Sequence, residues 1–198
     1  EFDVLISKDN TPILFHDYTL NVNMVKDSSG NWIDNSDLKI NNLTYDEISK
    51  YNIESLKPGS GYSDRFKNQK AVKGAKIPKL TDLFELAMEE QNKDVFLNLE
   101  VKSNPTLKGV TPEPKDMVEA IIKDIKKYDI GDRIVVTSFD WRILYELKKQ
   151  NSNILRGFLT LQQNLGSTKK NIYENSPWME KQFSLEDLFL LPNIIKSL

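Results

Sequence analysis

The second half of the sequence alternates amphipathic helices with short apolar strands, and this alternation constrains the fold more than any other feature. Apolar residues recur at helical spacing in residues 79–91 and 117–128, the second stretch beginning after two prolines. Asp140 is placed to cap a third helix at 141–150. Gly157 indicates a bulge or a close backbone approach in the last strand. The strands predicted between these helices span residues 95–101, 133–139 and 154–160. Such strand–helix–strand units build a parallel sheet.

The first half has a different pattern, because only the short tract Lys8–Thr11 separates strand patterns at residues 1–6 and 12–16. Locally this predicts an antiparallel hairpin, since parallel neighbours need a crossover of about a dozen residues. Residues 18–78, rich in Asn, Ser, Gly and Lys with one clear helix at 44–51, then form a long excursion. An insertion of this size is expected to shape or cover a binding site. We treat the whole chain as one domain.

Polar side chains share one face of these strands. Glu1 and Asp3 are two residues apart, so both carboxylates leave the same face of the first strand. Glu100 and Lys102 alternate with apolar residues along a later strand, so they share its polar face. The only histidine of the chain, His16, ends the second strand. Three carboxylates, a lysine and a histidine suit a hard divalent cation, an anion beside it and a group that moves a proton.

These residues, in this order, resemble the glycerophosphodiester phosphodiesterase family. The matching segments are Glu1–Val4 with the turn Ser7–Asp9, Pro12–Asp17, Lys76–Leu80, Leu99–Lys102 and Thr137–Asp140. The tract 51–80 is similar to a branch often carried on exported bacterial proteins, through Leu56–Gly59, Tyr62, Arg65, Phe66 and Gln69. The resemblance covers about residues 1–160. It implies a periplasmic or secreted location, with the cytoplasm as the alternative.

The resemblance also implies a fold and a reaction. Family members are TIM (β/α)8 barrels that hydrolyse glycerophosphodiesters to an alcohol and glycerol 3-phosphate with one divalent cation, Mg²⁺ or Ca²⁺. Carried over to this chain, the metal ligands are Glu1, Asp3 and Glu100, and His16 is one of two catalytic histidines. The glycerol 2-hydroxyl is the expected first nucleophile, giving a cyclic phosphate that water opens. We assign Lys102 to substrate binding, because a lysine beside a metal is a natural phosphate contact.

The resemblance leads us to expect an incomplete barrel of about five strands. It makes residues 1–6 and 12–16 parallel barrel members, and we adopt that arrangement over the hairpin. Strands 1–6 and 154–160 are then open edges, to be covered by a longer polypeptide or by another copy; the oligomeric state is not predicted. The family's other histidine, in a His-Arg-Gly motif, has no counterpart. We therefore expect this chain to be inactive or slowed by about 10²–10⁴-fold.

Composition excludes several other functions. The 198 residues carry 27 basic and 29 acidic side chains, with the lysines spread along the chain, so nucleic acid is not an implied partner. No stretch approaches the roughly 20 apolar residues that span a bilayer. The absence of cysteine excludes disulfides and thiolate metal ligands.

Other interpretations stay open. His16 could be structural or merely exposed, Glu1 a frayed terminus, and Lys102 a simple partner of Glu100. Asp17 more naturally anchors the loop or orients a neighbour than binds metal. A related phospholipase acting on intact lipid would need an apolar rim, for which the candidates are Phe139, Trp32 and Tyr62. A non-catalytic descendant would only bind phosphodiesters or partner proteins. The tryptophans are expected to serve packing, and they are Trp32, Trp141 and Trp178.

Overall fold

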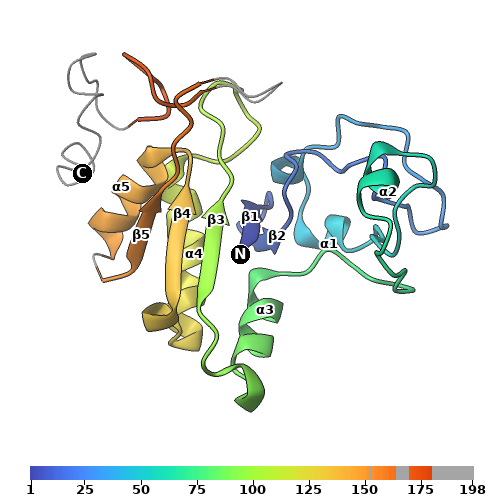
Figure 1. The fold of residues 1–198 in the computed structure, drawn as a ribbon, viewed down its shortest axis with the longest axis horizontal. Helices are drawn as coiled ribbons and strands as arrows, with labels where there is room; N and C mark the ends of the chain where they lie inside the picture. Colours follow the sequence, from blue (N-terminus) through green and yellow to red (C-terminus); the bar gives the residue numbers. More distant parts are fainter. Residues whose placement is uncertain (152, 164–169, 180–198) are drawn as a thin grey trace.

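A five-stranded sheet forms the centre of the computed structural model, which describes residues 1–151, 153–163 and 170–179 (Figure 1). The strand order is β2-β1-β3-β4-β5. Strands β1, β3, β4 and β5 are parallel, as the helix–strand alternation predicted, and β2 is antiparallel to β1. The strands are β1 (Phe2–Ile6), β2 (Pro12–Leu14), β3 (Leu97–Val101), β4 (Ile134–Ser138) and β5 (Leu155–Phe158).

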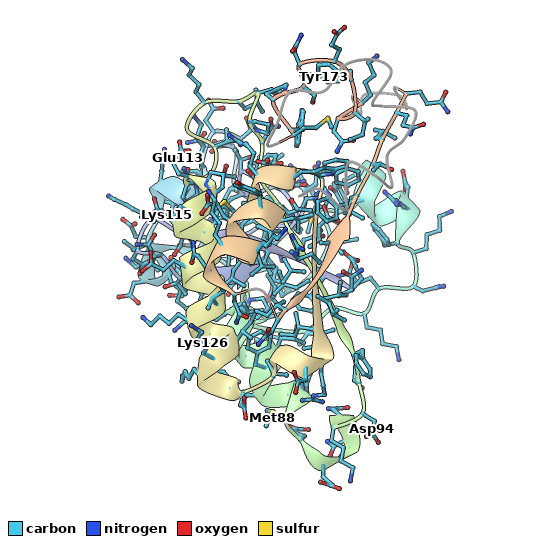
Figure 2. All side chains as sticks on the ribbon, turned by 90° about the vertical axis from the view of Figure 1, so that its left-hand side faces the viewer. Met88, Asp94, Glu113, Lys115, Lys126 and Tyr173 are labelled. Atoms are coloured by element: carbon cyan, nitrogen blue, oxygen red, sulfur yellow. The ribbon has the colours of Figure 1, made fainter. Side chains whose placement is uncertain are left out.

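Three helices lie between successive strands in the sequence, and their apolar residues form one core together with the sheet. They are α3 (Leu80–Ala87), α4 (Pro114–Tyr128) and α5 (Trp141–Gln150). The apolar residues on one face of β3 are buried in this core, where they join the apolar faces of all three helices. Figure 2 shows α4 and α5 side by side, with Glu113, Lys115 and Lys126 on the outside. Short 3-10 helices occupy Glu90–Asn92 and Gly131–Arg133.

Local sequence signals explain where these elements start and stop. Pro114 is the first residue of α4, where its missing N–H costs nothing. The Asp140 carboxylate accepts from the backbone N–H of Arg142 and caps α5, as predicted. Gly157 marks a close approach, because a Cβ there would lie 2.6 Å from Cγ2 of Thr137 on β4. The predicted glycine role in the last strand is therefore confirmed as close backbone packing.

The expectation that residues 1–6 and 12–16 are parallel barrel strands is wrong. They form an antiparallel hairpin in which Val4 pairs with Leu14 and Ile6 with Pro12. The connection is too short to carry the chain back to the start of β1, which a parallel neighbour would need. Strand β1 is consequently not an open edge, since β2 covers it, and the edges of the described sheet are β2 and β5.

The excursion at 18–78 folds around a small apolar core of its own, beside the β1–β2 hairpin (Figure 1). The predicted helix there is α1 (Tyr45–Ile48), begun by a capping box in which Thr44 and Glu47 exchange hydrogen bonds. Two further short elements were not predicted, the 3-10 helix Ile40–Asn42 and α2 (Gly61–Arg65). The excursion's buried residues are Leu20, Val25, Ile33, Ile40, Ile48 and Ile77, joined by Leu5, Ile13 and Phe15 of the hairpin segment. The assignment of the chain to a single domain stays a prediction.

Candidate active site

Three carboxylates converge where β1 begins and β3 ends. Asp3 is in register with Glu100 on the neighbouring parallel strand, and Glu1 precedes Asp3 on the same side. Glu1, Asp3 and Glu100 each offer an oxygen within 4.8 Å of the others. The structure therefore brings together the three residues that the sequence suggested as metal ligands.

Lys102 lies directly against this carboxylate cluster. Its Nζ is 2.8 Å from Oε1 of Glu100 and 3.6 Å from Oδ1 of Asp3. The Lys102 backbone N–H donates to the carbonyl of Val4, which fixes the end of β3 against β1. The side chain of Lys102 is only 14% exposed, so its ammonium offsets the repulsion between the carboxylates. The pairing with Glu100, one of two interpretations of this lysine, is observed.

His16 stands at the mouth of the site and is oriented by Asp17. Its Nδ1 is 2.7 Å from Oδ1 of Asp17, and Nδ2 of Asn21 donates to the other oxygen of Asp17 at 2.6 Å. This hydrogen bond to Asp17 raises the pKa of His16 above 6.5, although partial burial opposes the rise. The same contact lowers the pKa of Asp17 below 3.8. The His16 side chain is 65% exposed, so it is not a core residue, and the expected orienting role of Asp17 matches this geometry.

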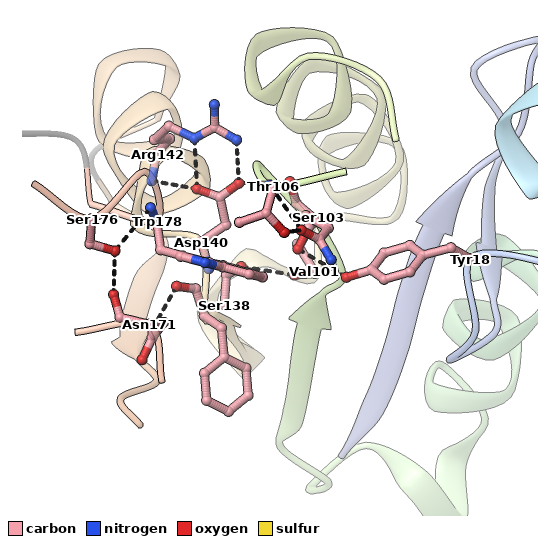
Figure 3. A network of polar contacts seen from close by, with 12 residues as sticks. Tyr18, Val101, Ser103, Thr106, Ser138, Asp140, Arg142, Asn171, Ser176 and Trp178 are labelled. Carbon is pink, nitrogen blue, oxygen red and sulfur yellow. Dashed lines mark hydrogen bonds and ion pairs between the residues drawn. The ribbon is translucent and has the colours of Figure 1, made fainter. Parts of the chain in front are cut away.

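A network of polar contacts joins the residues that follow β3 and β4 (Figure 3). The Asp140 carboxylate, fully buried, receives hydrogen bonds from Oγ of Ser103 at 2.7 Å and from the Arg142 guanidinium at 2.7 and 2.9 Å. The hydroxyl of Tyr18, two residues after His16, donates to the Ser103 carbonyl at 3.0 Å. Burial raises the pKa of Tyr18, so this hydroxyl remains a donor. The network ties β3, β4 and the segment that carries His16 into one frame.

A cleft of about 620 Å³ opens beside the cluster. His16, Glu100 and Lys102 form its polar side. Apolar side chains form much of the remainder, namely Leu107, Val110 and Leu161 with Phe139 and Trp178. The sequence marked only Phe139 among them, as a candidate for an apolar rim. The others come from loops after different strands, so no local pattern could identify them.

The aromatic residues considered in the sequence are distributed in three ways. Trp141 is fully buried, as expected for packing. Trp178 lines the cleft, beyond the packing role expected for it. Among the rim candidates, Phe139 lines the cleft and Tyr62 lines a second pocket that also contains His16. Trp32 instead stacks with Lys26, whose Nζ is 4.7 Å from the ring centroid, so this tryptophan is not part of either pocket.

The donor set of the cluster fits the cation that the sequence suggested. All three groups are carboxylates, and hard divalent ions such as Mg²⁺ and Ca²⁺ prefer oxygen ligands. The three carboxylates lie close enough together, with oxygens within 4.8 Å of one another, to be candidates for holding one such ion. An α/β sheet with such a cluster, a lysine and an oriented histidine has the parts of a phosphoryl-transfer or phosphate-ester hydrolase site.

The chain belongs to the Glycerophosphoryl diester phosphodiesterase family, whose model it matches over residues 1–183. A curated relative, the glycerophosphodiester phosphodiesterase of Caldanaerobacter subterraneus subsp. tengcongensis, is 28% identical over 159 residues, which are 80% of this chain and 53% of the relative. The family resemblance of the sequence is thereby confirmed.

Solved structures of similar proteins support the fold. A Silicibacter pomeroyi DSS-3 protein, provisionally assigned as a glycerophosphoryl diester phosphodiesterase, has a TM-score of 0.75 and 29% identity, covering 82% of this chain and 55% of that one. An Oleispira antarctica phosphodiesterase in complex with the product sn-glycerol-3-phosphate has a TM-score of 0.53 and 21% identity, covering 79% and 52%. The predicted architecture, an incomplete barrel of about five strands, is confirmed. The chain spans about half the length of these relatives.

In the part of the chain that the structure describes, no helix combines the length and the apolar character that crossing a bilayer requires.

Proposed function

We propose that this chain forms the catalytic centre of a metal-dependent glycerophosphodiester phosphodiesterase, which hydrolyses a small-molecule diester to an alcohol and glycerol 3-phosphate. The carboxylate cluster of Glu1, Asp3 and Glu100 beside Lys102 is the observation that carries this proposal. Membership of the family and the activity named for the Caldanaerobacter relative support it. The similarity of tract 51–80 to exported proteins supports a periplasmic or secreted location, which cell fractionation would test.

The three carboxylates would hold Mg²⁺ or Ca²⁺. A divalent cation at this position would polarise the phosphate and lower the pKa of the attacking hydroxyl. Lys102 contributes a second positive charge within 3.6 Å of two of the carboxylates. Its ammonium would bind a phosphate oxygen of the substrate, which makes Lys102 a substrate-binding residue in this proposal.

His16 serves as the acid–base residue of the site. Asp17 holds its Nδ1, so Nε2 is the atom that exchanges a proton with the substrate. The raised pKa keeps a larger fraction of the imidazole protonated near neutral pH, which suits a proton donor to the leaving alcohol. The chain contains no other histidine, so the opposite proton transfer has no histidine within these 198 residues.

Metal binding tests the proposal most directly. Titration calorimetry with Ca²⁺ and Mg²⁺ should give saturable binding that Asp3→Asn and Glu100→Gln each abolish or weaken by at least about tenfold, because each removes one anionic ligand. Asp94→Asn is the matched control. It makes the same charge change on an exposed residue at the end of the molecule far from Tyr173 (Figure 2).

Turnover gives the second readout. In a longer version of the protein that carries the family's second histidine, release of glycerol 3-phosphate from a glycerophosphodiester should require the added cation and should stop in EDTA. Unchanged metal affinity in both ligand variants, or undiminished turnover in EDTA, would contradict the proposal.

A further inference from the structure

His16 borders two pockets. One is the cleft with Glu100 and Lys102, and the other is a pocket of about 410 Å³ that the excursion forms with residues 15–17. A phosphodiester has two arms on one phosphorus atom, and the residue that protonates the leaving oxygen must stand next to the arm that departs. A proton donor between two pockets therefore suits a substrate that places one arm in each.

The second pocket combines aromatic, cationic and amide groups around an apolar floor. The rings of Tyr62 and Phe66 stack with centroids 6.3 Å apart, and the Arg65 guanidinium lies 5.1 Å from the Phe66 centroid. Gln69 lines the same pocket and can both donate and accept hydrogen bonds. Among the ion pairs of the described residues, none involves Arg65. Arg65 therefore brings a positive charge and five N–H donors to the lining of this pocket.

A chain of hydrogen bonds fixes this pocket relative to His16. Asn21 donates to Asp17 at 2.6 Å through its side-chain nitrogen, and its side-chain oxygen accepts from the backbone N–H of Asn23 at 2.9 Å. The Asn23 carbonyl accepts from the N–H of Lys57 at 2.8 Å, just before α2. The segment that carries Arg65 is thus anchored to the same aspartate that orients the histidine.

We infer that this second pocket is the subsite for the alcohol arm of the diester, and that Arg65 selects neutral, hydroxyl-rich alcohols over cationic ones. The inference rests on the function proposed above. The hydroxyl groups of a polyol can accept hydrogen bonds from Arg65, and they can both donate to and accept from Gln69. The C–H groups of the polyol would lie against the rings of Tyr62 and Phe66. A quaternary ammonium attracted to the same rings would meet the guanidinium that already occupies the cation–π position.

The experiment compares sn-glycero-3-phosphoglycerol with sn-glycero-3-phosphocholine on the Ca²⁺-loaded protein. The readout is the ratio of kcat/KM for the two diesters, or the ratio of Kd where turnover is too slow to measure. The wild-type protein should favour the glycerol diester by about five- to tenfold, as expected for one like charge several ångströms away in a partly solvated site. Arg65→Ala should bring the ratio close to one.

Lys67→Ala is the matched control, because Lys67 carries the same charge as Arg65 and lies two residues after it. The Lys67 side chain lines a neighbouring pocket that does not include His16. It should leave the preference intact. Equal values for the two diesters in the wild type, or an equal loss of preference in both variants, would overturn the subsite while leaving metal-dependent hydrolysis standing. Failure of the Ca²⁺-loaded protein to bind or cleave either diester would overturn both the subsite and the proposed function.

Discussion

Replacing Asp140 with alanine tests whether the network behind the site is a main contributor to stability. The Asp140 carboxylate is fully buried, caps α5 through the Arg142 N–H, and pairs with the Arg142 guanidinium and the Ser103 hydroxyl. Alanine removes all of these contacts at once. It leaves the hydroxyl of Ser103, itself 4% exposed, without this acceptor.

The size of the effect follows from two losses. Removing a helix N-cap costs about 1 kcal/mol, and breaking a buried ion pair by deleting one partner costs about 3–5 kcal/mol. The Arg142 side chain is 30% exposed and regains some hydration, so the lower end of that range applies. We expect Asp140→Ala to lower the free energy of unfolding by about 3–5 kcal/mol in total. A domain with about 5–15 kcal/mol of stability would still fold at least partly.

Urea denaturation followed by circular dichroism measures this change as a shift of the midpoint at constant slope. Asp140→Asn is the control, since it keeps the size, one acceptor oxygen and the cap, and should cost about 1–3 kcal/mol. A free energy of unfolding for Asp140→Ala within about 1 kcal/mol of the wild type would refute the role given to this network.

Three further predictions concern single positions. Gly157→Ala should lower the free energy of unfolding by about 1–3 kcal/mol through overpacking. Adding Thr137→Ser should recover most of this loss, because it removes the methyl group 2.6 Å from the new Cβ. A double variant no more stable in urea than Gly157→Ala alone would contradict this. Asp17→Asn should lower the pKa of His16, the one histidine resonance in an NMR titration. Because the folded-state pKa of His16 is raised, the stabilisation is complete below about pH 6.5 and is lost as the pH rises through the folded-state pKa. The advantage of the wild type in unfolding free energy should therefore shrink as the pH rises above about 6.5. In a longer version of the protein that carries the family's second histidine, His16→Ala should lower kcat by about 10²-fold or more with little change in Tm. A large fall in Tm with activity retained would show a structural histidine.

Periodicity was sufficient to predict the second half of the fold. Helices α3, α4 and α5 and strands β3 and β4 each contain a clear apolar pattern, whereas β5 does not. The two-residue period of strands also predicted that Glu1 and Asp3 share one face, and that Glu100 and Lys102 share another. Much less of the excursion at 18–78 could be predicted, because its core residues are single apolar positions far apart in the sequence and follow no period. Helix α2 has only five residues, too few for an apolar stripe.

The pockets could be predicted only in part. His16, Glu100 and Lys102 stand out because charged residues at strand ends are unusual in an otherwise apolar pattern. The loop residues of the large cleft and the position of Arg65 next to His16 depend on contacts between segments about 50 residues apart or more. Such contacts are set by tertiary packing, and local propensity carries no information about them.

The antiparallel course of β2 explains how the histidine reaches the carboxylates. Asp3 lies near the start of β1, and Val4 pairs with Leu14, so the chain runs back along β1 and the N–H of Phe15 donates to the Asp3 carbonyl at 3.1 Å. His16 follows at the level of the cluster. If β2 were parallel and its start were level with that of β1, Asp3 would lie opposite Ile13. His16 would then be about 10 Å further along, at roughly 3.3 Å for each of three residues. The short hairpin that the local sequence favoured is therefore also the arrangement that places His16 level with the start of β1.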